Sequence, residues 1–326
     1  MNEDVLFFNT LRREEHISSY LEGCTSLFNK TKNSPFIGTL IFSNHSNDLE
    51  PWVLAQELLS NFKTKHPFIA VNPTLNHPYY VAKKIVALSR LYDRRVFINF
   101  IIGTSLSELT AVGESLSHDS RYRRLEEFIK IVQGLLVTKK PMTFKGHFYE
   151  INNLKLSSVI DNVMLMPEFY IAGSSETCSN VRANTGCSNL KMIKPIDKWV
   201  KQENVGIYLG IIARANYEEA VSVLKEKFSA IYEEADFILD ISMKNTDAKW
   251  KKELMQEGID KHFRMEPFKN VVADCPYLVG SYAEVATYLK AYINKGVHTF
   301  IIDTDLDDFN NTSRVIDLVY QKQNIH

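Results

Sequence analysis

Glycine, cysteine and a surplus of either charge are all scarce in this sequence of 326 residues. Its 13 glycines are about 4% of the chain, against an average near 7%. Lysine plus arginine (38) nearly balance aspartate plus glutamate (39), so the net charge is only −1. The chain therefore lacks the basic surplus with which proteins hold nucleic acid or an anionic membrane. We expect its partner to be a small molecule or another copy of itself.

Four cysteines are present, at Cys24, Cys178, Cys187 and Cys275. Their spacing matches neither a metal site nor a redox pair, which predicts buried, reduced thiols in a reducing compartment. The segment Met1–Arg13 places acids before a short apolar run, unlike a secretory signal. The longest apolar run has about nine residues, within Val205–Ala213, and a membrane span needs roughly 20. We expect a cytoplasmic protein with no membrane-spanning segment.

The common sequence-readable enzyme motifs are also missing. The chain has no GxGxxG, P-loop, GxSxG or HExxH pattern, and its nine histidines do not cluster at metal-ligand spacing, so no metal is expected. Apolar residues nevertheless make up 45% of the chain and aromatics 11%. These are ordinary globular values that can fill a sizeable core.

Short apolar runs alternate along the chain with stretches of helical period, which is typical of strands and helices around a parallel sheet. The predicted strands are Val5–Phe8, Phe36–Phe42, Pro67–Val71, Val96–Ile102, Phe169–Ala172, Leu190–Ile193, Val205–Ala213 and Thr299–Asp303. The helix of the sixth unit is unclear. Eight units without a flexible linker predict an α/β fold, a (β/α)8 TIM barrel in which residues 1–326 form one domain. Insertions are expected at about 137–166, after the fourth helix, and at about 237–280, before the eighth strand. The first insertion should contain a β-hairpin of Met142–Phe144 and Phe148–Ile151.

Barrel enzymes carry their chemistry at the carboxyl ends of the strands, which selects a few loops for inspection. Gly173-Ser174-Ser175 opens a helix with small residues, where free N–H groups and the helix dipole favour an anion such as phosphate. An ordinary serine N-cap explains the same residues. Gly103-Thr104-Ser105 carries the same two interpretations. His118, at the start of the fourth helix, is either a ligand-facing group or a capping or surface histidine.

An ordered series of short segments runs through these loops. It comprises His77-Pro78, Ala82, Asp93-Arg-Arg95, Asn99, Gly103-Thr104-Ser105, Glu108, Gly113, Leu116 to Tyr122, Glu127-Phe128, Phe144 to Phe148, Phe169 to Ser175, Leu278 to Ser281 and Gly296 to Phe300. Taken together, the series resembles the bacterial luciferase-like, flavin-dependent monooxygenases, most of all the alkanesulfonate monooxygenase branch. The resemblance covers roughly residues 36 to 320.

This resemblance implies a TIM barrel that assembles as a dimer or tetramer and uses FMN, delivered in reduced form by a separate flavin reductase. It implies that the phosphate is held by the turn Gly173-Ser174-Ser175 together with His118 and Tyr122. It places Asn72, at the end of strand three, and the loop with Gly103 and Thr104, after strand four, beside the isoalloxazine.

The chain departs from the sulfonate enzymes where those carry substrate-binding arginines. Strand seven has Tyr208-Leu209-Gly210 in place of an arginine and a histidine, and Asn47 stands near the position of a cysteine. The segment Met265–Leu278 is shorter and lacks a glycine-rich loop with a further arginine. Because a sulfonate requires fixed guanidinium donors, a sulfonate substrate is not expected.

The leading functional prediction is a two-component monooxygenase that oxidises a small organic substrate with oxygen. His45, after strand two, and Tyr208, on strand seven, are the candidate catalytic side chains; the alternatives are a loop histidine and a tyrosine that packs the barrel. Two other functions stay open. One is hydride transfer with a deazaflavin, and the other is a degenerate, flavin-binding or scaffold member of the family, which the missing arginines suggest.

Overall fold

The computed structural model describes residues 5–10, 17–42, 50–228, 235–258 and 260–321. Eight parallel strands flanked by helices form a closed barrel, as the sequence predicts. The barrel strands are β1 (Leu6–Thr10), β2 (Gly38–Ile41), β3 (His66–Val71), β4 (Phe97–Phe100), β7 (Glu168–Ala172), β8 (Ser188–Met192), β9 (Val205–Arg214) and β12 (Val297–Asp303). They pair in this order, and β12 pairs with β1 to close the ring.

The principal helices follow the barrel strands along the chain. They are α1 (Ile17–Lys32), α2 (Pro51–Asn61), α3 (Pro78–Tyr92), α5 (His118–Val137), α6 (Glu176–Thr185), α7 (Tyr217–Phe228), α11 (Tyr282–Asn294) and α12 (Phe309–Tyr320). Proline lies in the first turn of α2 and of α3, where its missing N–H costs nothing, and Glu50 and His77 cap these two helices. A short helix that the sequence did not predict, α4 (Leu106–Ala111), follows β4.

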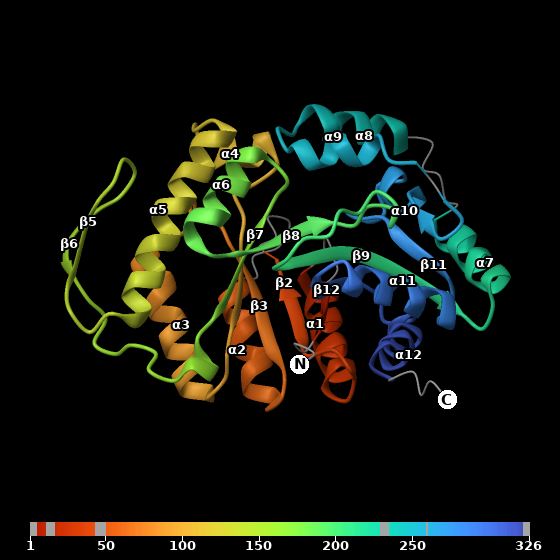
Figure 1. The fold of residues 1–326 in the computed structure, drawn as a ribbon, viewed down its shortest axis with the longest axis horizontal. Helices are drawn as coiled ribbons and strands as arrows, with labels where there is room; N and C mark the ends of the chain where they lie inside the picture. The colour runs from red at the N-terminus through yellow and green to blue at the C-terminus, as the bar shows by residue number, and fades with distance from the viewer. Residues whose placement is uncertain (1–4, 11–16, 43–49, 229–234, 259, 322–326) are drawn as a thin grey trace. The chain divides into compact units, whose positions relative to one another are not determined.

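The chain divides into two compact units, each described here by itself. Unit 1 consists of Met1–Leu40, Leu190–Asn245 and Trp250–His326; unit 2 consists of Ile41–Asn189 and Thr246–Lys249. Within unit 2, α3, α5 and α6 succeed one another beside the strands β3, β4 and β7 (Figure 1). That the whole chain is a single domain stays a prediction.

Ring contacts in unit 2 identify the two faces of its strands. The ring of Phe100 on β4 lies 6.0 Å from Phe128 of α5, so Phe100 faces the helices. Because side chains alternate along a strand, Phe97 and Asn99 face the opposite, inner side. There the rings of Phe68 and Phe97 lie 5.9 Å apart, and Tyr170 lies 4.8 Å from Phe68. Phe68, Phe97 and Tyr170 therefore form an aromatic layer on the inner side.

The same reasoning identifies the faces in unit 1. Phe7 and Phe300 pair in register and stack at 4.9 Å, and Phe7 meets Tyr320 of α12 edge-on at 5.5 Å. Phe300 thus faces the helices, and Asp303, three residues later, faces the inner side. Tyr208 pairs with Ile301, which also lies on that inner face. The side chain of Tyr208 therefore faces the inner side of the sheet.

The first insertion contains the predicted hairpin, formed by the antiparallel strands β5 (Met142–Lys145) and β6 (Glu150–Leu154), and then a 3-10 turn (Val163–Leu165). The Glu127 carboxylate on α5 accepts three backbone N–H bonds from His147, Phe148 and Tyr149 at 2.7–3.0 Å. Gly146 allows the close approach of this carboxylate, from which a Cβ at position 146 would lie only 2.3 Å away. The hairpin is therefore anchored on α5.

The second insertion is built from short helices and strands. It contains α8 (Ala235–Lys244), α9 (Lys249–Met255), β10 (Phe263–Arg264), α10 (Glu266–Lys269) and β11 (Tyr277–Ser281). The strand β11, which was not predicted, runs parallel to the last part of β9. In the sixth unit no helix separates β8 from β9 in residues 193–204, all of which are described.

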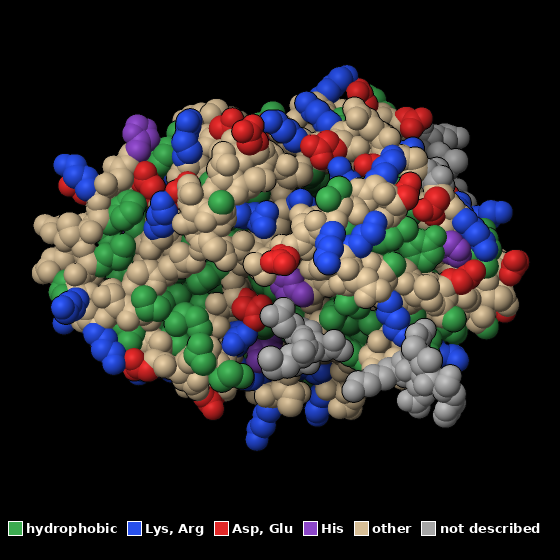
Figure 2. Space-filling view, viewed as in Figure 1, with side chains coloured by type: hydrophobic (Ala, Val, Ile, Leu, Met, Phe, Trp, Pro, Cys, Tyr) green, Lys and Arg blue, Asp and Glu red, His purple; other side chains and the backbone are tan. Residues whose placement is uncertain are grey.

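The cysteines and the surface charges are arranged as the composition predicts. The four cysteine thiols are buried and reduced. Basic and acidic side chains are interspersed on the face shown in Figure 2. Among the described helices, none is both long and apolar enough to cross a membrane.

Candidate functional site

The turn after β7 is built around Gly173. This residue has φ +146°, and a Cβ added to it would lie 2.1 Å from the hydroxyl oxygen of Tyr122. The Tyr122 hydroxyl donates a 2.8 Å hydrogen bond to the carbonyl of Ala172. Burial, reinforced by the Cys178 thiol, raises the pKa of Tyr122 well above its usual value, so the phenol stays neutral. A side chain at position 173 would collide with this phenol, so the turn requires glycine.

The two serines of the turn have different roles. Ser175 caps α6, because its hydroxyl accepts a 3.1 Å hydrogen bond from the N–H of Cys178. The N-cap interpretation is thus correct for Ser175. The Ser174 hydroxyl oxygen is buried and has no hydrogen-bond partner among the described residues. Buried hydroxyls are normally satisfied, so this oxygen, beside the N-terminus of a ten-residue helix, suits an anion such as a phosphate.

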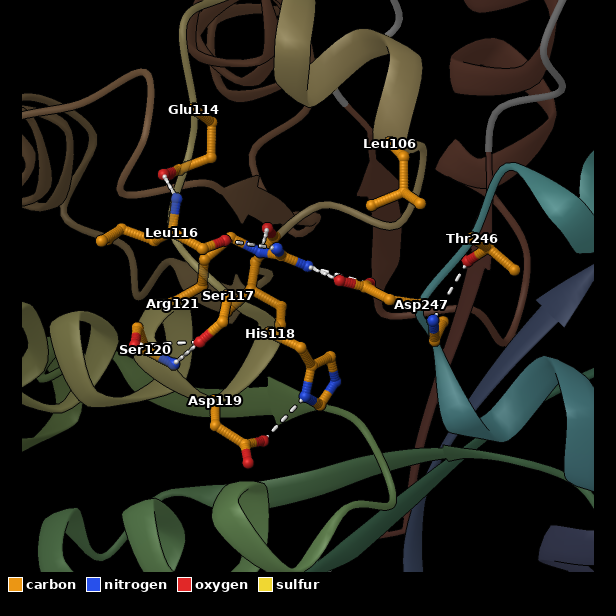
Figure 3. Close-up of polar contacts among 12 residues, drawn as sticks. Leu106, Glu114, Leu116, Ser117, His118, Asp119, Ser120, Arg121, Thr246 and Asp247 are labelled. Carbon is orange, nitrogen blue, oxygen red and sulfur yellow. Dashed lines mark hydrogen bonds and ion pairs between the residues drawn. The ribbon is translucent and has the colours of Figure 1, made fainter.

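His118 joins this turn from α5, of which it is the first residue. Its ring meets the ring of Tyr122 edge-on at 5.1 Å, and its Nδ1 lies 2.9 Å from a carboxylate oxygen of Asp119 (Figure 3). Hydrogen bonds from His118 and then from Thr177, in the first turn of α6, lower the pKa of Asp119. His118, Tyr122 and Gly173 therefore lie together, as the resemblance implies.

The loops after β3 and β4 also meet. Gly103 has φ +79°, and a Cβ there would lie 2.7 Å from Leu109 and 3.4 Å from the side-chain nitrogen of Asn72. The other end of the Asn72 amide is occupied, because its oxygen accepts a 3.0 Å bond from the N–H of Thr74. Thr104 is exposed beside Gly103. Asn72 and Gly103 are neighbours, whereas contact of Thr104 with a cofactor stays a prediction.

Arg121 fixes the surroundings of the site. Its guanidinium is 2% exposed and donates to the backbone carbonyls of Ile102 at 3.2 Å and Leu116 at 3.0 Å. Its remaining nitrogen binds both carboxylate oxygens of Asp247, at 2.9 and 2.8 Å (Figure 3). Arg121 thus ties the end of β4 and the segment Thr246–Lys249 to the start of α5.

Asn99 is a candidate site residue to which the sequence assigned no role. It is 2% exposed on the inner face of β4, and its side-chain oxygen has no hydrogen-bond partner among the described residues. It pairs in register with Ala70 on β3 and with Tyr170 on β7. The one available signal was a polar residue inside the otherwise apolar run Val96–Ile102.

The two candidate catalytic residues lie elsewhere in the chain. Tyr208 belongs to unit 1, where burial, and after it the charge of Asp303, raises its pKa well above the usual value. His45 lies outside the described residues. All eight candidate cofactor-binding residues belong to unit 2.

Sequence comparison points to one family. Residues 68–187, a span that contains all eight of these residues, match the family model described as luciferase-like monooxygenase. The chain is 28% identical to 4-(gamma-L-glutamylamino)butanoyl-[BtrI acyl-carrier protein] monooxygenase BtrO of Niallia circulans, over 91% of each chain. It is 29% identical to the FMNH(2)-dependent dimethylsulfone monooxygenase of Pseudomonas fluorescens (strain Pf0-1), over 48% of this chain and 46% of that one.

Solved structures show the same fold. The EDTA monooxygenase from Chelativorans sp. BNC1 superposes with a TM-score of 0.74 at 12% identity, over 97% of this chain and 93% of that one. A long-chain alkane monooxygenase gives 0.73 at 14% identity, over 98% and 92%. An F420-dependent secondary alcohol dehydrogenase gives 0.67 at 15% identity, over 98% and 100%.

Proposed function

We propose that this chain is a luciferase-like monooxygenase of the two-component type: it binds FMN reduced by a separate flavin reductase and oxidises a small organic substrate with oxygen. We propose further that it works as a homo-oligomer, a dimer or a tetramer. The relatives, one of them named as FMNH(2)-dependent, support monooxygenase chemistry with a reduced flavin, and the choice of FMN as that flavin rests on the phosphate site described next.

One observation carries the choice of cofactor. The Ser174 hydroxyl is buried without a partner among the described residues, next to a glycine that can have no Cβ and to the N-terminus of α6. These groups fit a phosphate monoester such as that of FMN, since hydrogen bonds to a charged acceptor would satisfy a hydroxyl that is otherwise costly to bury. Riboflavin, which lacks the phosphate, would leave it unsatisfied.

When bound, the reduced flavin supplies the electrons with which oxygen is split between the product and water. The protein's contribution is position and shielding. Tyr122, neutral at physiological pH, fixes the turn that would meet the phosphate, and Asn72 and Gly103 bring two strand ends together. Asn99 offers a buried amide oxygen on the inner face of β4.

The relatives support a monooxygenase reaction, but their names give different substrates. By their names, one acts on an acyl group carried by an acyl-carrier protein and another on dimethylsulfone. A sulfonate is disfavoured because two arginines of unit 1 are committed to carboxylates of the chain. Arg214, at the end of β9, lies 2.6 Å from Asp308, and the guanidinium of Arg264 donates to Glu266 at 2.9 Å.

The test is a titration with FMN, with anaerobically reduced FMN and with riboflavin, on the wild type and two matched variants. Ser174→Ala should weaken FMN affinity about tenfold or more, because a hydrogen bond to a charged group is lost, and should leave riboflavin affinity unchanged. Ser179→Ala, which removes an exposed hydroxyl of the same helix, should change neither. Equal FMN affinity of wild type and Ser174→Ala would contradict the phosphate site.

A deazaflavin, added to the same series of titrations, decides between the remaining functions. A deazaflavin that binds more tightly than FMN and supports hydride transfer would replace the proposal, in line with the fold shared with an F420-dependent dehydrogenase. If the protein binds no flavin, the remaining function is that of a scaffold. Oxygen consumption with reduced FMN and the reductase then tests the oxygenase reaction itself.

A further inference from the structure

The helix α8 of unit 1 leaves most of its apolar side chains uncovered. Among its ten residues, all of which are described, only Ala235 is buried. Phe237, Ile238 and Ile241 are 65%, 39% and 49% exposed, and their spacing places them on one face of the helix. Single exposed apolar side chains are normal on a protein surface, whereas a contiguous group of them marks an interaction surface.

The residues after α10 extend this face. The helix α8 contacts α10, and Val271 and Val272, which follow α10, are 40% and 42% exposed. Val271 has φ +60°, a left-handed conformation that favours glycine or asparagine and is strained for a β-branched residue. Such strain persists where the surrounding structure or a function requires it. We refer to Phe237, Ile238, Ile241, Val271 and Val272 together as the α8 face.

A helix of this length depends on packing for its stability. An isolated helix of ten residues is marginal in water, because nucleation of its first turn is unfavourable. Most helical stability in proteins comes from burial of an apolar face, yet α8 exposes that face. A surface that covers Phe237, Ile238 and Ile241 would therefore stabilise the helix.

A row of charges runs along one edge of α8. Asp236, Asp240 and Lys244 are spaced by four residues, so they follow one another along the helix, with the acids first and the base last. Lys244 lies 2.5 Å from Asp240, but the two side chains are 75% and 55% exposed. An exposed pair of this kind contributes little to stability, and the lysine has three donors, so it can also bind a second acid.

This arrangement complements a second copy of the same helix. When two α8 helices lie antiparallel across a two-fold axis, their apolar faces meet and their rows of charges run in opposite order. Lys244 of each copy then lies toward the acidic end of the other. The opposed helix dipoles favour the same orientation. A second copy supplies both matches by symmetry, whereas an unrelated partner would have to supply each of them separately.

We propose that the α8 face is a contact surface between two copies of this chain, which pair across it with their α8 helices antiparallel. This inference rests on the homo-oligomer of the proposed function and names its interface. It does not depend on which cofactor the chain binds.

The test measures molecular mass against protein concentration by sedimentation equilibrium. Wild type should associate as its concentration rises. Ile241→Glu introduces a charge into the apolar contact, twice in each dimer, and should weaken the association at least about a hundredfold. Val200→Glu, at a side chain of unit 1 that is 78% exposed and lies outside the α8 face, should change it by less than about twofold. Because both positions are exposed, both variants should fold.

A charge reversal tests the antiparallel order. Lys244→Glu brings like charges together across the axis and should weaken the association about tenfold. Lys201→Glu makes the same change at an exposed lysine of unit 1 outside the α8 face and should have less than about a twofold effect. Equal effects of these two reversals would overturn the antiparallel order.

Two results would overturn the interface itself. One is a wild type that stays monomeric at every concentration, and the other is an association that Ile241→Glu weakens no more than Val200→Glu does. Reduced FMN is titrated on the same samples. Flavin binding by a wild type whose association ignores Ile241→Glu means that α8 is not the interface and the flavin enzyme stands. Association that depends on Ile241, without flavin binding, means the reverse.

Discussion

The close approach of Gly173 to Tyr122 can be tested with a double-mutant cycle. In Gly173→Ala the new Cβ would fall 2.1 Å from the Tyr122 hydroxyl, so the phenol must move and its 2.8 Å bond to Ala172 is lost. Overpacking costs about 1–3 kcal/mol, a lost hydrogen bond about 1, and φ +146° adds about 1–3 for a residue other than glycine. We expect a loss of about 3–7 kcal/mol in unfolding free energy.

Tyr122→Phe alone removes only the hydroxyl and should cost about 1–2 kcal/mol. In that background the alanine Cβ would meet the ring carbon Cζ at 3.2 Å and the Cys178 sulfur at 3.1 Å, which small movements relieve. The double variant should therefore be about 2 kcal/mol more stable than the sum of the single effects.

The assay is urea unfolding, and the unfolding free energies are compared among variants that have equal m-values. FMN titration of each variant accompanies it. Tyr122→Phe should retain FMN binding within about threefold, and Gly173→Ala should lose about tenfold or more, because the new methyl group occupies the turn. Additivity of the two substitutions within about 0.5 kcal/mol would refute the contact. Unchanged FMN affinity of a folded Gly173→Ala variant would refute the phosphate turn.

Three further outcomes follow from other parts of unit 2. Asp247→Ala leaves the buried guanidinium of Arg121 without its carboxylate and should cost about 3–4 kcal/mol of unfolding free energy; a loss below about 1 kcal/mol in urea unfolding would contradict this role. Glu127→Gln keeps one acceptor oxygen for three hairpin N–H groups, so limited proteolysis should cut residues 138–167 several-fold faster, and an unchanged rate would argue against the anchor. Burial alone would raise the pKa of Glu114, but hydrogen bonds, including one from Arg124, lower it overall. Because the folded pKa lies below the unfolded one, this stabilisation is present above the unfolded value, near 4.3, and is lost as pH falls through the folded value. The stability difference between wild type and Glu114→Gln should thus shrink in acid, and a constant difference would show that the carboxylate does not titrate this way.

The barrel was predictable because its strands and helices have different apolar periods. Runs such as Val96–Ile102 are buried on both faces and are flanked by amphipathic helices, so the period changes at each boundary. The strand β11 escaped detection because its pairing with β9 is a long-range contact and its five residues follow a polar insertion. The helix α4 has six residues, too few for a period to be visible.

The candidate site was predictable only where local sequence carries the signal. Scarce glycine made Gly103 and Gly173 conspicuous, and both have positive φ. No local pattern shows that Arg121 pairs with Asp247, 126 positions away, or that the amide of Asn99 lacks a partner. Arg121 lies three residues after His118 in the sequence, yet its donors are used within unit 2.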